Sequence, residues 1–403
     1  MTLRFPMMIC SVLLLAATTS RGADWPVWRG PSGSGISTEA GWAPWDEKGP
    51  RIAWRAQVGV GFSSFVAARG RVYTAGYADD ADSIVCLDAE TGKVVWKHSY
   101  PAELGAKFFE GGTTGTPTVD GDRVYFLSRA GDVWCLDAAA GKPIWSANIQ
   151  KQLGVNVPGW GFGGAPVVHQ DLLLLNAGEA GVALDKASGK VVWQSGKKDA
   201  GYSTPYLTRV GTDTLAIFGS AQSYIAVNPQ TGKEAWRVRW VTQFGVNAAD
   251  PIVDGGRMFI SSGYGKGCTL VQLTADQPPK EVWKSRVLRT QMNAAVLFDG
   301  HLFGVDGDTT EKASLKCVEL STGTEKWVHP GFGSGTVILA DGKLIALAAD
   351  GELSVAPASP QGFKQVASAR VLTGKCWTVP VLSDGRIYCR NWKGQIVCVD
   401  VRK

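Results

Sequence analysis

The chain has 403 residues, of which 45% are hydrophobic and 19% charged, and it contains 50 glycines and 19 prolines. Its formal net charge of +5 falls to +3 when Arg4 and Arg21 are removed, an excess too small to indicate a nucleic-acid or anionic-membrane partner. No stretch keeps the 3.6-residue periodicity of an amphipathic helix. The composition favours many short strands joined by tight turns.

Residues 1–22 have the pattern of a secretory signal peptide. Arg4 supplies the positive charge, and Met7–Ala17 is an apolar run too short to span a bilayer. We expect cleavage after Gly22, with cleavage after Ala23 as the alternative. Cys10 lies inside the apolar run, so no lipoprotein cysteine marks the cleavage site. The sequence therefore predicts a periplasmic or secreted protein without a transmembrane helix in its mature part.

Residues 23–50 form an irregular segment rich in proline and glycine. It holds four tryptophans, which are Trp25, Trp28, Trp42 and Trp45. We expect this segment to pack on the outside of the folded domain. A glycan platform or a partner contact is the alternative role for its tryptophans.

A recurring phrase begins in the region after residue 51. It reads CLDAETGKVVW at 86–96, CLDAAAGKPIW at 135–145 and ALDKASGKVVW at 183–193, and further copies end at Trp236 and Trp327. A phrase that returns at a fixed period indicates one supersecondary unit copied along the chain. Each unit has a strand that opens near Pro, an Asp-Gly turn, a second strand, a third strand ending in Leu-Asp, and a fourth strand with Trp. Four antiparallel strands in about 40–50 residues are typical of a β-propeller blade.

Counting these units gives the expected architecture. The opening strands begin near Ser64, Pro117, Pro166, Pro205, Pro251, Ala295, Thr336 and Val379. The fourth strands carry Trp54, Trp96, Trp145, Trp193, Trp236, Trp283 and Trp327, and we expect an eighth, degenerate one at 363–366. Pairing of the Trp54 strand with the Cys398 strand would close the ring and remove its exposed edges. We predict an all-β, eight-bladed propeller of four-stranded antiparallel blades over residues 51–403, with seven blades as the alternative.

The cysteines do not indicate a redox or zinc site, because no Cys-x-x-Cys is present. Four of them occupy the same position in different repeats, namely Cys86, Cys135, Cys317 and Cys398. Equivalent positions in different blades are too far apart to be bridged, so these residues are expected to be small buried apolar side chains.

The repeat resembles the quinoprotein, or PQQ-type, β-propeller repeat. Leu87–Trp96 fits most of the motif Ala-x-Asp-x-x-Thr-Gly-Lys-x-x-Trp, and the resemblance covers roughly residues 50–403. It implies that each Trp docks between neighbouring blades. In size the chain is closest to BamB-like exported propellers, and Asp24–Pro31 looks like the start of such proteins in planctomycete bacteria. That resemblance implies a partner bound through variable loops, although this chain lacks the lipoprotein cysteine of the BamB group.

We expect function on the face that carries the loops between blades. The Asp-Gly and Thr-Gly-Lys turns of the other face are uniform and are explained by hairpin geometry. The loops are rich in aromatic residues and glycine and should surround the mouth of the central channel. These side chains either plug the channel or line a ligand or partner site. The candidate binding residues are Phe108, Trp160, Phe162, Phe244, Asn247, Arg289, Asn293, Phe332 and Trp377.

Catalysis has weak support in the sequence. A quinoprotein dehydrogenase would need PQQ and calcium, for which Glu110, Asn247 and Asp250 are the candidate ligands, yet these residues are scattered and no adjacent cysteine pair exists. We therefore expect no catalytic residue, cofactor or metal. The leading hypothesis is an exported, non-catalytic scaffold that binds an envelope protein. The alternatives are a PQQ- and calcium-dependent alcohol or sugar dehydrogenase and a carbohydrate-binding propeller.

Overall fold

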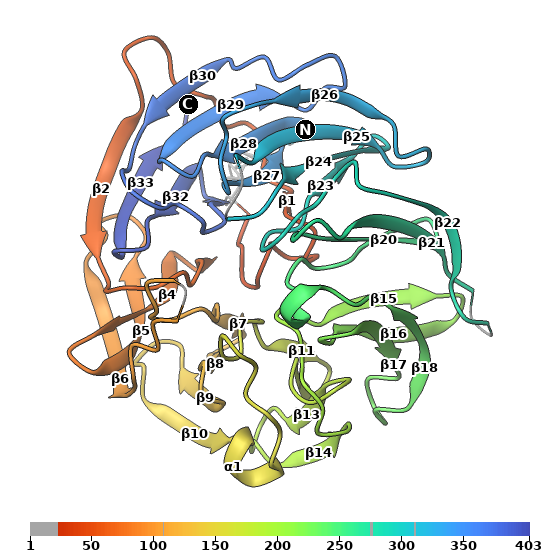
Figure 1. The fold of residues 1–403 in the computed structure, drawn as a ribbon. Helices are drawn as coiled ribbons and strands as arrows, with labels where there is room; N and C mark the ends of the chain where they lie inside the picture. The colour runs from red at the N-terminus through yellow and green to blue at the C-terminus, as the bar shows by residue number, and fades with distance from the viewer. Residues whose placement is uncertain (1–22, 108, 275–276, 310–311) are drawn as a thin grey trace, which may run out of the picture.

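The structure is a computed structural model that describes residues 23–107, 109–274, 277–309 and 312–403. Over these residues the strands form eight antiparallel sheets arranged around a central hub (Figure 1). This confirms the predicted all-β, eight-bladed propeller in preference to the seven-bladed alternative. The predicted signal peptide, residues 1–22, and the candidate residue Phe108 lie outside the described residues.

Each blade begins with a strand at the hub and continues outward. The innermost strands are β3 (Val66–Ala68), β7 (Thr118–Asp120), β11 (Val167–His169), β15 (Tyr206–Val210), β19 (Ile252–Asp254), β23 (Val296–Phe298), β27 (Thr336–Ala340) and β31 (Val381–Ser383). The second strands are β4 (Arg71–Ala78), β8 (Arg123–Leu127), β12 (Leu172–Leu175), β16 (Asp213–Gly219), β20 (Arg257–Ser262), β24 (His301–Asp306), β28 (Lys343–Leu347) and β32 (Arg386–Arg390). The second strands are almost entirely buried, because both of their faces pack against neighbouring blades.

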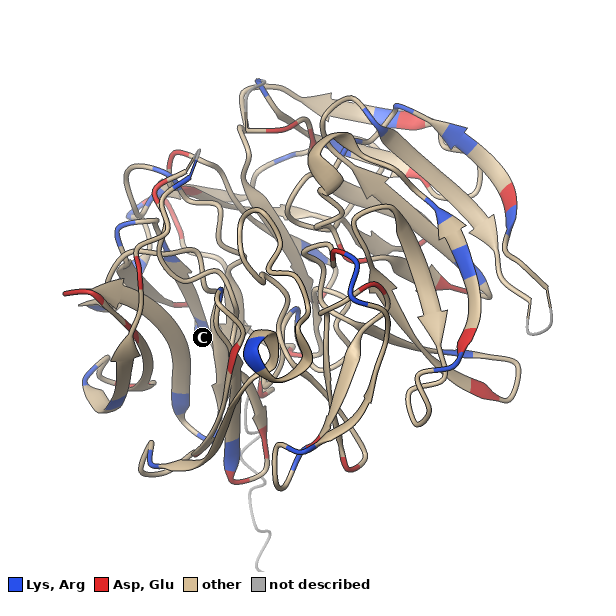
Figure 2. Cartoon of the chain, turned by 60° about the horizontal axis from the view of Figure 1, so that its bottom comes forward, with Lys and Arg blue, Asp and Glu red and all other residues tan. Residues whose placement is uncertain are grey.

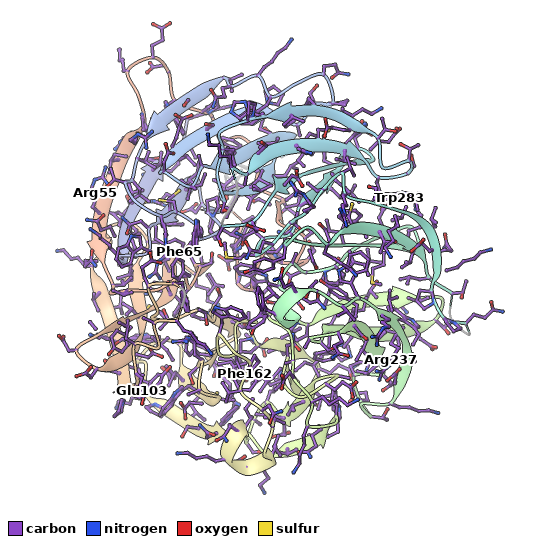
Figure 3. All side chains as sticks on the ribbon, in the orientation of Figure 1. Arg55, Phe65, Glu103, Phe162, Arg237 and Trp283 are labelled. Carbon is purple, nitrogen blue, oxygen red and sulfur yellow. The ribbon has the colours of Figure 1, made fainter. Side chains whose placement is uncertain are left out.

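The outer half of each blade carries the repeated phrase. The third strands are β5 (Ala81–Asp88), β9 (Asp132–Asp137), β13 (Val182–Asp185), β17 (Ser223–Val227), β21 (Gly267–Gln272), β25 (Ser314–Glu319), β29 (Glu352–Pro357) and β33 (Gln395–Asp400). The fourth strands are β6 (Val94–Pro101), β10 (Pro143–Asn148), β14 (Val191–Gln194), β18 (Glu234–Arg239), β22 (Lys280–Ser285), β26 (Glu325–His329), β30 (Ala367–Arg370) and β2 (Arg51–Gln57). Arg55 and Trp283, both on fourth strands, lie at the outside of the ring, and Phe65 lies nearer the hub (Figure 3).

The last blade combines the two ends of the described chain. The N-terminal strand β2 pairs antiparallel with β33, and Trp54 stands opposite Cys398. The fourth strand of the preceding blade is β30, which begins at Ala367 and not within 363–366 as predicted. The reason is that the Phe363 ring packs against Trp327 of the neighbouring blade, with 5.9 Å between ring centroids, so this stretch fills the junction between blades instead of extending a sheet.

Three of the Asp-Gly turns have the left-handed backbone typical of tight hairpins. At Asp299-Gly300 the φ angles are 45° and 71°, and Asp341-Gly342 and Asp384-Gly385 also have two successive positive values. Such pairs form the tight hairpins whose twist matches that of the strands they join.

The repeated tryptophans connect each blade to the next. Among the described residues, six of these indoles donate a hydrogen bond from Nε1 to a backbone carbonyl of the following blade, at distances of 2.8–3.1 Å. The donors are Trp54, Trp96, Trp145, Trp193, Trp283 and Trp327. The glycine of the next Thr-Gly-Lys turn lies against the indole face, and a Cβ built on Gly92 would stand 2.5 Å from Trp54. The Nε1 of Trp236 is buried and has no hydrogen-bond partner among the described residues.

The N-terminal segment does not pack outside the propeller as expected. It enters the ring of blades (Figure 1), where Trp25 bridges to Ala67 on innermost strand β3. The buried Arg29 guanidinium donates at 2.6 Å to the carbonyls of Ala294 and Ala295, just before β23. Strand β1 (Ile36–Ser37) then pairs parallel with β27. At the hub, the innermost strands have backbone N–H and C=O groups that no neighbouring strand pairs. The segment forms hydrogen bonds with some of these groups as it crosses the hub, and its Trp25 side chain is buried there.

Helical structure is confined to two short elements in the described part of the chain, α1 (Ile149–Leu153) and the 3-10 turn η1 (Gln243–Gly245). None of the helices described here is long and apolar enough to cross a membrane. The seven cysteines of the described ranges are buried and unpaired, and burial raises the pKa of the Cys86 thiol to about 12.

Candidate functional site

An open cavity of about 460 Å³ lies at the channel mouth on the loop face. Its walls come from loops that are distant in sequence and meet because every innermost strand begins at the hub. We call this cavity the aromatic cup. Its ring-bearing residues are Trp28, Phe62, Phe109, Trp160, Tyr202, Phe244, Tyr264 and Trp377.

The rings of the wall form two arcs. In the first arc Phe62 stacks on Trp377 with 5.4 Å between centroids, and Phe109 lies 5.8 Å from Phe62. In the second, edge-to-face contacts of 5.6–6.3 Å connect Tyr202, Trp160, Phe244 and Tyr264 in that order. Such contacts hold aromatic side chains in fixed orientations at little entropic cost. The cup therefore presents a preformed apolar surface.

Phe244 is the most exposed of these rings. It lies in η1, has a φ of 64°, and is 64% exposed. A positive φ is unfavourable for a residue with a Cβ, so the backbone here is held in a conformation that directs a large apolar side chain into solvent. In Figure 1 this short green turn projects toward the centre of the ring.

The floor of the cup is supplied by the N-terminal segment. The Trp28 indole donates to Asp250 Oδ2 at 2.6 Å, and the Thr204 backbone N–H donates to Oδ1 at 2.8 Å. Asp250 is 7% exposed. One of its hydrogen-bond donors, Thr204, lies just before β15, and the other, Trp28, belongs to the N-terminal segment. The Asp250 carboxylate therefore holds the N-terminal segment against the blades.

Electrostatics at the floor are dominated by burial. Burial raises the pKa of Asp250, while the Arg29 charge and the hydrogen bonds from Trp28 and Thr204 oppose that rise. The Arg29 Nε lies 4.0 Å from Asp250 Oδ2, and burial lowers the pKa of this guanidinium. The floor thus holds two charges of opposite sign, whose fields largely cancel toward the cup.

The polar groups of the cup are few. Asn293 Nδ2 donates to the Trp377 carbonyl at 3.0 Å. The Thr378 hydroxyl is buried in the cup and has no hydrogen-bond partner among the described residues. At the rim, Lys375 Nζ lies 4.6 Å from the Trp377 ring centroid and forms an ion pair with Glu110. An apolar occupant could therefore be oriented by a hydroxyl and a cation.

Four of the predicted binding residues line the cup together, namely Trp160, Phe244, Asn293 and Trp377. Of the other predicted residues that the structure describes, none lines the cup. Phe162 and Phe332 are buried in cores between blades. Arg289 forms an ion pair with Asp306 at 2.9 Å. Some aromatic residues of these loops are therefore buried between blades, and others face the cup. The channel below the cup is filled by the N-terminal segment.

Sequence reasoning missed Trp28, Phe62 and Tyr264 as cup residues. Phe62 follows Gly-x-Gly ahead of the first innermost strand, the same setting as the other glycine-rich loops, so the loop pattern could have identified it. Trp28 could not be assigned this way, because its position depends on the path of the irregular segment.

The residues considered for calcium and PQQ do not fit that cofactor. Both oxygens of Asp250 accept protein hydrogen bonds. Asn247 Nδ2 donates to the carbonyls of Ser220 and Trp240, and its Oδ1 accepts from Ser262. Within the described ranges, no cluster of three or more His, Cys, Asp or Glu side chains could hold a metal ion. Calcium requires six to eight oxygen ligands, which this arrangement does not supply.

Comparison with known proteins identifies a matching family model. The sequence matches the family model described as outer membrane protein assembly factor BamB over residues 43–114 and 105–329, which is more than half of the chain. No curated protein matches the sequence.

Solved structures share the architecture at low identity. BamB from Moraxella catarrhalis is 16% identical with a TM-score of 0.60, covering 87% of this chain and 99% of that one. Quinohemoprotein alcohol dehydrogenase from Comamonas testosteroni is 14% identical with a TM-score of 0.68, covering 96% of this chain and 81% of that one. The computationally designed protein Ika8 is 12% identical, with a TM-score of 0.58 and coverage of 86% and 98%. At these identities the likeness shows the fold alone.

Proposed function

This chain belongs to the family of outer membrane protein assembly factor BamB, and on that premise we propose that it is an exported, non-catalytic propeller that binds a segment of an envelope protein in its aromatic cup. The first 22 residues, with their signal-peptide pattern, support the export that this role requires.

The observation that carries the proposal is the open, preformed aromatic cup. Residues that dominate protein interfaces are enriched in tryptophan and tyrosine and lie in central pockets surrounded by polar groups. Here two arcs of rings surround a hollow, and the 64% exposed Phe244 stands at its edge. A partner segment that inserts an apolar side chain would cover these rings and could reach the free Thr378 hydroxyl.

The proposal predicts that Phe244→Ala weakens partner binding without lowering stability. Truncation of an aromatic side chain that a partner covers reduces affinity by about tenfold or more, whereas removal of an exposed ring changes the free energy of unfolding by about 0.5 kcal/mol or less. A photo-crosslinking residue at position 244 should capture an envelope protein. The dissociation constant for that protein should then be measured by calorimetry with wild type and variant.

The matched control is Val94, which is 57% exposed on the outer strand β6. A crosslinker at 94 should capture nothing, and Val94→Ala should bind the partner as wild type does. Equal capture from both positions would contradict a role for the cup. Reduction of a redox dye in the presence of PQQ and calcium would support the dehydrogenase alternative instead. Retention on insoluble polysaccharide that Trp160→Ala abolishes would support carbohydrate binding.

A further inference from the structure

A second hollow, of about 540 Å³, lies beside the cup on blade 5. The loop between β18 and β19, the turn between β20 and β21, and the end of β22 form its walls. Tyr264 lines both hollows. We call the second hollow the basic groove, because its charged lining residues are Lys266, Lys284 and Arg286.

Two of these cations are held over one indole ring. The Nζ atoms of Lys266 and Lys284 lie 4.5 and 5.6 Å from the ring centroid of Trp240. Trp240 is 2% exposed, and its own N–H donates to Ser262 Oγ at 3.0 Å, so the ring is fixed. Cation–π attraction therefore holds two ammonium groups at the same place, although they repel each other.

No carboxylate neutralises this cluster. Among the described residues, no ion pair includes Lys266, Lys284, Arg286 or the nearby Arg239. Burial, followed by the charges of Lys284 and Arg239, lowers the pKa of Lys266. Elsewhere basic and acidic residues are interspersed over the blades (Figure 2), and Lys316, for example, contacts both Asp306 and Glu325. The basic groove is an exception to this pattern.

A buried hydroxyl provides an independent indication of a ligand. Thr242 lines the groove and is 6% exposed, yet its Oγ1 has no hydrogen-bond partner in the described part of the chain. Buried polar groups in native proteins are normally paired, so such an atom calls for a partner from outside. A hydroxyl can donate to an anion that the ammonium groups attract.

We propose that the basic groove is a binding site for a phosphate group, independent of the partner role of the cup. Three clustered cations require more than one negative charge for neutralisation, and a phosphate monoester carries close to two at neutral pH, whereas a carboxylate carries one. Its several oxygens can accept from two ammonium groups, a guanidinium and the Thr242 hydroxyl at once. The phosphate comes either from a soluble compound or from a phospholipid whose headgroup is itself a phosphate monoester, as in phosphatidic acid.

The test is binding of pyrophosphate by calorimetry at low ionic strength. Wild type should bind, and Lys266→Gln/Lys284→Gln should bind about tenfold or more weakly, with a smaller dependence on salt. The control Lys93→Gln/Lys97→Gln removes two exposed lysines of blade 1 and should bind as wild type does. Thr242→Val leaves the charge unchanged and should weaken binding about threefold to tenfold, which general attraction to a basic surface would not produce. Equal melting temperatures establish that the variants are folded.

Two further measurements identify the source of the phosphate. Vesicles that contain phosphatidic acid, compared with vesicles of phosphatidylcholine alone, test the lipid headgroup. Binding to pyrophosphate alone supports a soluble ligand, and binding to the anionic vesicles that the double variant loses supports a lipid. Absence of binding to both overturns the site. The assignment is also overturned if the double variant retains wild-type affinity, or if tetraglutamate binds as tightly as pyrophosphate.

Discussion

Two carboxylates of the turn face and two of the loop face have pKa values shifted in opposite directions. On the turn face, the Thr91 hydroxyl and backbone N–H donate to Asp88 and lower its pKa, and Ser188 does the same for Asp185. On the loop face, burial raises the pKa values of Asp82 and Asp250, that of Asp82 to about 6. Asp88 and Asp185 are solvated caps that stabilise hairpins. Asp82 and Asp250 are buried, and the fold tolerates the burial of Asp250 where its oxygens hold the N-terminal segment at the floor of the cup.

The largest effect is expected at the floor of the cup. Trp28→Ala removes a half-buried ring and leaves Asp250 without one of its donors, so we expect a loss of about 3 kcal/mol in the free energy of unfolding. Urea denaturation measures it. Trp45→Ala is the control, because that indole N–H has no partner among the described residues, and its loss should be clearly smaller. Equal losses would mean that the threaded segment is not fastened by Asp250.

The turn face can be tested with two glycines of one blade. Gly121 and Gly141 have φ values of 61° and 69°, but a Cβ on Gly121 meets open space whereas one on Gly141 would stand 2.5 Å from Trp96. Gly121→Ala should cost about 1 kcal/mol for the backbone conformation alone. Gly141→Ala should cost about 2 kcal/mol more, since the indole must move. Thermal unfolding of both variants measures the difference, and similar values would contradict tryptophan docking as the reason for this glycine.

The smallest effect is a dependence of stability on pH at Asp82. Its pKa in the folded protein, about 6, lies above the ordinary value of 3.8, so its contribution to stability is fully present below pH 3.8 and is lost as pH rises through 6. The loss should approach about 2 kcal/mol. Asp82→Asn should flatten the stability profile over this range, as measured by denaturation at a series of pH values. In Asp88→Asn the profile between pH 4 and 6 should keep the wild-type slope, because the pKa of Asp88 is lowered.

Much of the fold follows from the sequence because it depends on local interactions. The Asp, Thr or Ser, and Gly of the repeated phrase form one turn within a few residues, and Gly92 is needed both for its φ of 70° and for the indole it faces. Alternation and turn chemistry therefore locate the strands and the number of blades. The degenerate fourth strand begins a few residues later than the sequence predicts, because Phe363 packs between blades. No local pattern in the sequence encodes that contact.

The candidate site was only partly predictable. The glycine-rich loops indicate that aromatic residues gather at the channel mouth, and Trp160, Phe244, Asn293 and Trp377 do so. Which rings face the cup and which fill blade tops depends on packing between blades.

The sequence by itself determined the repeat, its turns and the tryptophan that joins one blade to the next, since these interactions recur at fixed spacing. Only the tertiary structure decided that Trp28 reaches Asp250, 222 positions away, and that Lys266 and Lys284 meet over Trp240 beside Arg286. Both arrangements arise when the ring brings distant loops to one hub, and side-chain contacts of that kind have no period in the sequence.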